Sequence, residues 1–153
     1  MSGIEIERKF LVKGDFKPFV TKKERIVQAY ICSSKDRTVR VRIKGESAYL
    51  TIKGDTNGNG FSRLEFEYSI PISDAESLLK IALPGLIEKE RNYIPFGKHV
   101  YEVDVFYGKY EGLIVAELEL ESESEVFEKP DWLGEEVTGQ EKYYNAYLAA
   151  HLA

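Results

Sequence analysis

Glu5, Glu7 and Lys9 alternate near the start of the chain with residues of the opposite parity, among them Ile6 and Phe10. In a β-strand successive side chains point to opposite faces, so the three ionic groups share one face of such a strand. Carboxylates are ligands that hard divalent cations prefer, and a lysine can hold a phosphate as a point charge. The spacing therefore predicts a strand face that could bind a metal ion, an anion or both.

The same alternation recurs along the chain, and the charges are sorted by sign. Arg40 and Arg42 form a basic strand face, whereas Glu117 and Glu119 form an acidic one. Further charged positions with this spacing are Lys53, Arg63, Glu65, Glu67, Lys89, Arg91 and Asp104. An open sheet with one wet, charged face is one interpretation of this pattern. The sorting of the charges favours another, a closed barrel with a polar interior.

Charges inside a barrel need partners, because removing an ion from water costs several kcal/mol. Water, opposite charges or an ionic ligand could supply them. A polyanion would satisfy the arginines and lysines, and a divalent cation such as Mg²⁺ or Mn²⁺ would satisfy the carboxylates. A phosphate chain that carries a divalent metal would satisfy both sets together.

Strands and two helices must position these residues. Alternation with period two predicts strands over residues 4–12, 25–32, 38–44, 48–53, 61–70, 86–94, 99–106 and 113–121. A cap at Ser73 predicts one helix, which ends before Pro84, and residues 140–152 predict a terminal helix. Residues 54–60 and 130–138 read as loops, and residues 122–129 could form a short helix. We expect a mainly β (α+β) fold, an eight-stranded antiparallel β-barrel with a few helices outside.

Length and composition narrow the class of protein. The 153 residues predict a single domain, 1–153, and a net charge of −5 does not favour binding to nucleic acid. Cys32 is the single cysteine, which excludes an internal disulfide and fits a reducing compartment. No apolar run suits a membrane span, and the charged N-terminus lacks a signal-peptide core. We expect a soluble cytoplasmic protein, either a monomer or a homodimer.

The chain resembles the CYTH superfamily, the triphosphate tunnel metalloenzymes, and in particular its short bacterial, tripolyphosphatase-like members. The Glu-x-Glu-x-Lys strand matches at Glu5, Glu7 and Lys9, and the basic strand matches at Arg40 and Arg42. Further matches are Lys53, the Arg63–Glu67 run, the basic pair Lys89 and Arg91, Asp104, the Glu117–Glu119 run, the Trp132–Thr138 segment and Tyr143–Asn145. The resemblance implies a charged tunnel through an eight-stranded antiparallel barrel.

The resemblance also implies roles for these residues. Phosphate would be bound by Lys9, Arg40, Arg42, Lys53, Arg63, Lys89 and Arg91. Mg²⁺ or Mn²⁺ would be bound by Glu5, Glu7, Glu117 and Glu119, with Asp104 nearby. Glu5, Glu7 and Lys9 would also take part in catalysis, while Glu65 and Glu67 would orient the attacking water or only balance Arg63. Tyr30 and Lys142 could contact phosphate, or could be a barrel-wall residue and a surface residue respectively.

A small-molecule triphosphate is the substrate class that follows. The leading hypothesis is metal-dependent hydrolysis of inorganic tripolyphosphate to pyrophosphate and phosphate. Within the family, a class IV-type adenylyl cyclase and a thiamine triphosphatase are the alternatives. A non-catalytic polyphosphate- or nucleotide-binding module is an alternative of another class, although so many carboxylates exceed what binding alone needs.

Overall fold

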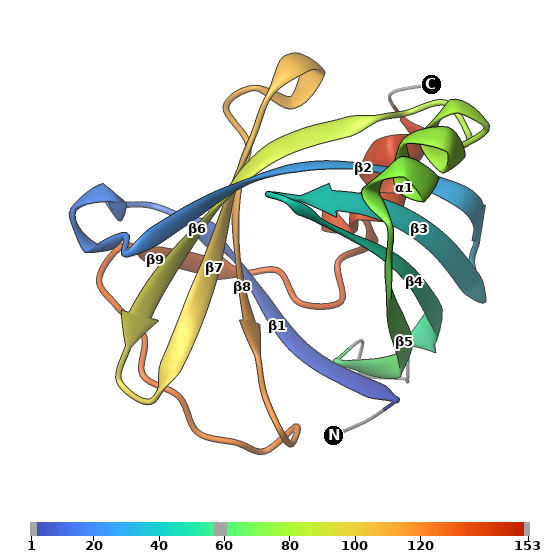
Figure 1. The fold of residues 1–153 in the computed structure, drawn as a ribbon. Helices are drawn as coiled ribbons and strands as arrows, with labels where there is room; N and C mark the ends of the chain where they lie inside the picture. Colours follow the sequence, from blue (N-terminus) through green and yellow to red (C-terminus); the bar gives the residue numbers. More distant parts are fainter. Residues whose placement is uncertain (1–2, 57–60, 152–153) are drawn as a thin grey trace.

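Eight antiparallel strands form a closed ring in the computed structural model, which describes residues 3–56 and 61–151 (Figure 1). In ring order they are β1 (Ile4–Val12), β5 (Ser62–Ile70), β4 (Ser47–Thr56), β3 (Arg37–Lys44), β2 (Lys22–Ser34), β6 (Ile87–Phe96), β7 (His99–Phe106) and β8 (Ile114–Glu119). The predicted eight-stranded antiparallel barrel is thereby confirmed.

Strand β1 closes the ring because it pairs with two strands that lie far apart in the sequence. Its first part pairs with β5, with Ile6 opposite Ser62, and its second part pairs with β8, with Glu7 opposite Glu119. A ninth strand, β9 (Leu133–Glu136), pairs with β1 beyond the stretch that β5 occupies. The Lys9 backbone N–H donates to the Thr138 hydroxyl at 2.8 Å, so this segment is fastened to the middle of β1.

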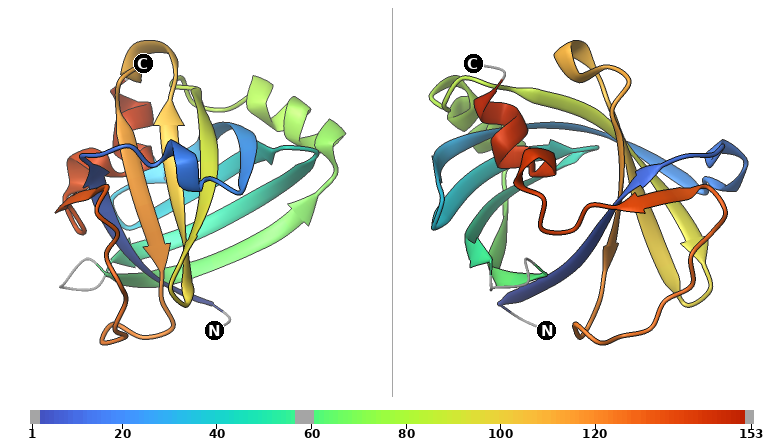
Figure 2. Two further views of the ribbon diagram at one scale, coloured as in Figure 1. Left: turned by 90° about the vertical axis from the view of Figure 1, so that its left-hand side faces the viewer. Right: turned by 180° about the vertical axis from the view of Figure 1, so that it is seen from behind.

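The apolar side of the alternation forms the main core outside the ring. Phe10, Tyr101 and Leu118 are buried there together with Trp132, which belongs to the segment between β8 and β9. The rings of Tyr101 and Trp132 pack edge to face with their centres 5.5 Å apart. This segment passes along the outside of β1, β7 and β8 (Figure 2). The polar side of the same strands consequently faces the interior of the ring.

Two α-helices cover different parts of the barrel. Helix α1 (Ile72–Lys80) packs on the outer face of the strands, where Ala75 joins Val41 and Ala48 in a small apolar cluster. Helix α2 (Asn145–Ala150) packs across one end of the ring (Figure 2). Short 3₁₀ turns lie at Lys17–Phe19, Gly108–Tyr110 and Glu141–Tyr143. No described helix has the length and apolar character that a membrane crossing needs.

Several predicted boundaries were wrong. Residues 122–129 form turns and extended chain, where the Glu125 carboxylate accepts from the Glu121 backbone N–H. Closely spaced carboxylates would repel one another in a helix, which explains why none forms there. Helix α1 begins at Ile72, after an extended Pro71, with no side-chain cap at Ser73.

The predicted loops and terminal helix also differ from the structure. Strand β9 lies inside the segment read as a loop, 130–138, and the terminal helix is reduced to the turn at residues 141–143 followed by α2. Strand β4 extends through Thr56, so residues 54–56 of the predicted loop 54–60 belong to a strand; residues 57–60 lie outside the described residues.

Candidate active site

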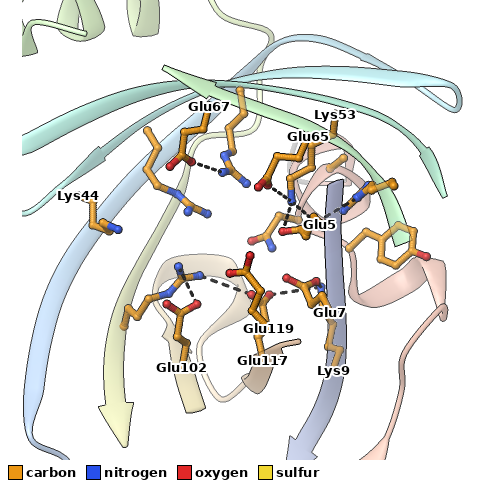
Figure 3. A pocket seen from close by; sticks show the side chains of 17 residues that line it. Glu5, Glu7, Lys9, Lys44, Lys53, Glu65, Glu67, Glu102, Glu117 and Glu119 are labelled. Atoms are coloured by element: carbon orange, nitrogen blue, oxygen red, sulfur yellow. Dashed lines mark hydrogen bonds and ion pairs between the residues drawn. The ribbon is translucent and has the colours of Figure 1, made fainter. Parts of the chain in front are cut away.

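A charged cavity of about 150 Å³ lies inside the ring (Figure 3). It is lined by the cations Lys9, Arg40, Arg42, Lys44, Lys53, Arg63 and Arg91 and by the carboxylates Glu5, Glu7, Glu65, Glu67, Glu102, Glu117 and Glu119. Tyr144, Asn145 and Ala146 complete the lining at the start of α2. The seven cations and seven carboxylates cancel in formal charge, so the lining has no net preference for an anion alone.

Strand β1 places Glu5 against two cations of β4 and β5. The Lys53 ammonium lies 2.9 and 3.1 Å from the Glu5 carboxylate oxygens, and Arg63 Nε lies 3.5 Å away. Burial opposes ionisation of Glu5, but Lys53 and Arg63 outweigh it and hold the pKa of this carboxyl far below its usual range. In the free protein Glu5 is therefore an ionised partner of these cations.

Lys9 lies between two carboxylates on the same strand and on β8. Its ammonium is 3.5 Å from Glu117 and 3.9 Å from Glu7, and it donates to the Tyr143 backbone carbonyl at 3.2 Å. Burial favours the neutral amine, but Glu117 and Glu7 outweigh it and raise the pKa of Lys9 above its ordinary value. Lys9 is suited to stabilising negative charge and not to accepting a proton.

Some carboxyl groups of the cavity lie where the neighbouring cations do not fully offset the cost of ionising them. Burial, reinforced by Glu117 and Glu5, raises the pKa of Glu7 to about 8. Burial also raises the pKa of Glu119, with a further contribution from Glu5, and the pKa of Glu102, against the opposing effect of Arg91. A cation in this part of the cavity would relieve the repulsion.

Arg40 and Arg42 lie two residues apart on β3 and face the same cavity. The carboxylates near them do not fully neutralise their positive charge. Arg40 Nε is buried and has no hydrogen-bond partner among the described residues, and the nearest carboxylate oxygen to its guanidinium, of Glu67, is 3.9 Å away. Burial, together with Arg40 and Arg91, lowers the pKa of Arg42 to about 9. An anion placed between these arginines would supply the acceptors that the protein lacks there.

Asp104 lies outside the cavity lining, next to Arg91, and is engaged with two cations of β6. Its carboxylate accepts from Arg91 Nε at 2.8 Å and from a terminal Arg91 nitrogen at 2.9 Å, and Lys89 Nζ is 2.6 Å away. Burial lowers the pKa of Lys89 to about 7, although Asp104 opposes the shift. Neither Lys89 nor Asp104 belongs to the cavity lining, and Asp104 fixes the guanidinium of Arg91.

Residues 3–148 match the family model described as the CYTH domain. The chain belongs to the CYTH family. It is 46% identical over 147 residues to a protein of Acetivibrio thermocellus named inorganic triphosphatase, a match that covers 95% of this chain and 93% of that protein. An inorganic triphosphatase of Nitrosomonas europaea is 35% identical over 150 residues, covering 95% and 96% respectively.

A solved structure with the same arrangement of strands supports this membership. The crystal structure of an inorganic triphosphatase superposes on this CYTH domain with a TM-score of 0.68 and 31% sequence identity. The match covers 95% of this chain and 93% of that one.

The CYTH cavity brings together most of the residues that the sequence singled out. Lys89 and Asp104 lie outside its lining, as described above. Tyr30 faces the interior but packs with Leu148 and Ala149 of α2 in an apolar cluster, outside the cavity lining. Lys142 is exposed, and its ammonium lies 5.2 Å from the ring of Tyr143. The structure thus gives neither Tyr30 nor Lys142 a place in the cavity.

Sequence reasoning gave no role to several residues of the site. Lys44 and Glu102 have the parity of their charged neighbours Arg42 and Asp104, and this signal could have identified them. Tyr144 lies near two cations, with its ring centre 5.5 Å from Lys9 Nζ and 5.4 Å from the Arg63 guanidinium carbon. It lies just before α2, where no strand periodicity applies.

The donor set of the CYTH cavity fits a hard divalent metal. CYTH triphosphatases are generally metal-dependent. Glu7, Glu117 and Glu119 offer oxygen ligands on neighbouring strands, although no group of three His, Cys, Asp or Glu side chains within the described ranges is arranged to hold a metal ion. Mg²⁺ commonly binds through one or two carboxylates, its own waters and substrate phosphates, which suits separated carboxylates.

Proposed function

We propose that this protein is a metal-dependent triphosphatase that hydrolyses inorganic tripolyphosphate to pyrophosphate and phosphate. The observation that carries the proposal is the cavity, in which an incompletely paired arginine and carboxyl groups that repel one another line the same space. A phosphate chain with a divalent metal is the ligand that satisfies both. The two relatives named inorganic triphosphatase support the choice of an inorganic substrate.

The basic residues would hold the phosphate chain. Arg40, Arg42 and Arg91 present guanidinium groups that can make forked hydrogen bonds to phosphate oxygens. Lys9, Lys53 and Arg63 would add charge from the other side, and Lys44 would act from the rim of the same basic strand. Lys89 would act on the phosphate indirectly, because it pairs with Asp104, which in turn holds Arg91. These contacts keep the reacting chain fixed and neutralise charge as the bridging oxygen leaves.

The carboxylates would serve the metal and the water. Glu7, Glu117 and Glu119 would hold Mg²⁺ or Mn²⁺, with Glu5 available once phosphate competes for Lys53. A bound metal would neutralise phosphate charge and lower the pKa of a coordinated water. Glu65 and Glu67 pair with Lys53 and Thr51 in the free protein and would be free to orient water when phosphate takes these partners.

The experiment compares phosphate release from tripolyphosphate, ATP and thiamine triphosphate with Mg²⁺, Mn²⁺ or EDTA, with ATP products analysed for cyclic AMP. Metal-dependent release chiefly from tripolyphosphate supports the proposal. Formation of cyclic AMP would identify an adenylyl cyclase. Preferential cleavage of thiamine triphosphate would identify a thiamine triphosphatase. Tight binding without turnover would indicate a binding module.

Substitution of a proposed metal ligand sharpens the experiment. Glu117→Gln should lower kcat by at least about 100-fold, because catalysis would lose both a ligand and the charge beside Lys9. Glu135→Gln on the exposed side of β9 is the matched control and should retain wild-type turnover. Wild-type rates in Glu117→Gln would remove this residue from the metal site.

Three further predictions accompany the proposed function. The chain forms one domain, 1–153, acts in the cytoplasm, and is a monomer or a homodimer. Light scattering coupled to size-exclusion chromatography distinguishes the two oligomeric states.

A further inference from the structure

The buried amide of Gln28 and the partly buried amide of Asn145 connect Arg42 to the start of helix α2. Arg42 Nε donates to the Gln28 amide oxygen at 2.7 Å, and the Gln28 amide nitrogen donates to the Asn145 amide oxygen at 3.1 Å. Lys89 Nζ donates to the same Asn145 oxygen at 3.0 Å. Gln28 and Lys89 are fully buried, so water does not compete for these groups.

The chemistry of the two cations fixes the direction of this chain of hydrogen bonds. Arginine and lysine have donors but no acceptor, so the amide oxygens of Gln28 and Asn145 must face them. The Gln28 amide nitrogen is then left facing Asn145, whose oxygen accepts from two donors. Neither amide can rotate by half a turn without placing a donor against a donor.

Gln28 is positioned by the barrel and Asn145 by the helix. Gln28 lies opposite Arg42 in the β2–β3 ladder, so its distance from the arginine is set by strand pairing. Asn145 is the first residue of α2, and this helix is held to the barrel by Leu148 and Ala149, which pack with Ile87 and Phe106. The Asn145 acceptor is consequently present only while α2 is docked; without it Lys89 keeps the Asp104 carboxylate, whereas Gln28 loses its acceptor.

We propose that Gln28 and Asn145 are positioning residues that hold the Arg42 guanidinium toward the bound phosphate chain, and that docking of α2 sets this orientation. The identity of the ligand rests on the proposed function, whereas the orientation of Arg42 does not. With Nε engaged by Gln28, the terminal nitrogens of Arg42 are left to donate into the cavity.

A double-mutant cycle tests the link between Gln28 and Arg42. Gln28→Met preserves the length of the side chain and removes the acceptor. It should raise the KM for tripolyphosphate about 10-fold, because a hydrogen bond to a charged group is lost. Adding Gln28→Met to Arg42→Met should change KM less than about 2-fold further, because the residue to be oriented is already gone. Effects that multiply in the double variant would overturn the proposal.

Substitutions at Asn145 test the contribution of the helix. Asn145→Asp keeps an acceptor for both donors and should keep KM within about 3-fold of wild type, whereas Asn145→Leu should raise it about 10-fold. Asn92→Leu is the matched control, because Asn92 is a buried amide whose hydrogen bonds go to the backbone of β6 and β7. It should lower stability without raising KM. Equal KM effects for Asn92→Leu and Asn145→Leu would overturn the proposal.

A spectroscopic measurement separates this proposal from the proposed function. In ¹⁵N NMR spectra of the free protein, the Arg42 Nε–H, assigned by its loss in Arg42→Lys, should exchange slowly with water. The Gln28→Met variant keeps Arg42 but lacks the acceptor for its Nε–H. In this variant the signal should broaden or disappear. An unchanged signal would overturn the positioning role even in a protein that hydrolyses tripolyphosphate, and a lost signal would support it even in one that does not.

Discussion

The guanidinium of Arg40 is buried with an incomplete set of partners, and this has a measurable consequence. Arg40→Ala should weaken tripolyphosphate binding about 10- to 100-fold, because charge-assisted hydrogen bonds to phosphate are lost. The melting temperature should stay the same or rise, since a buried nitrogen without a partner is removed. Calorimetric titration and thermal melts measure the two quantities.

Arg25→Ala supplies the control for this substitution. Arg25 is exposed and pairs with Glu88 on the outside of the barrel, so its loss should leave affinity unchanged. Equal losses of affinity in both variants would mean that net charge, and not Arg40 in the cavity, determines binding.

Protonation of Glu7 should make stability depend on pH in the metal-free protein. The carboxyl ionises near pH 4.5 in the unfolded chain and near pH 8 in the folded one. Between these values the folded state binds more protons, so this group's contribution to stability falls as pH rises. Relative to wild type, Glu7→Gln should gain about 4 kcal/mol in free energy of unfolding from pH 5 to pH 9.

Urea denaturation at both pH values, in EDTA, measures this difference. Glu135→Gln on the exposed side of β9 should show no such gain. A constant difference between Glu7→Gln and wild type would show that Glu7 is ionised across the whole range.

Helix α2 should influence the site although most of it lies outside the cavity. Leu148→Ala would remove buried contacts with Tyr30 and Phe106 and should lower the free energy of unfolding by about 2 kcal/mol. It should also raise KM for tripolyphosphate, because Asn145 would lose its fixed position. Val126→Ala, at an exposed position, should change neither quantity. An unchanged KM in a clearly destabilised Leu148→Ala protein would separate the helix from the site.

The elements show what the sequence could predict. Alternation with period two identified the interior face of β1, β3 and β8 because charges there are spaced by two residues. The same period cannot tell how deep a side chain lies, and Asp104 therefore appeared equivalent to carboxylates that line the cavity. Strand β9 is short and contains Gly134, so it carries little periodic signal.

The roles of the neutral amides could not be predicted, for a different reason. Gln28 and Asn145 have ordinary residue types for a strand and a helix start, and only their burial beside Arg42 and Lys89 gives them importance. Their relation joins residues more than a hundred positions apart, which strand and helix patterns do not encode.

At the scale of the whole molecule, the balance of charge in the cavity predicts joint binding. Tripolyphosphate alone would meet seven carboxylates, and Mg²⁺ alone would meet seven cations. Both together should therefore raise the melting temperature by more than the sum of their separate effects. Thermal melts with each ligand and with both measure this, using pyrophosphate-free tripolyphosphate and a sulfate control. Strictly additive shifts would contradict coupled binding.

The closure of the barrel by β1 also has a consequence for folding. The first strand made during synthesis must wait for Ser62–Leu64 and then for residues 115–119 before both of its edges are paired. Such non-local pairing slows folding, since chain entropy is lost before distant contacts compensate for it. Until β1 is paired on both sides, its ionic face remains hydrated. The chain can therefore assemble its site only in the last steps of folding, so recovery of activity after dilution from denaturant should lag behind the formation of the local β2–β5 hairpins.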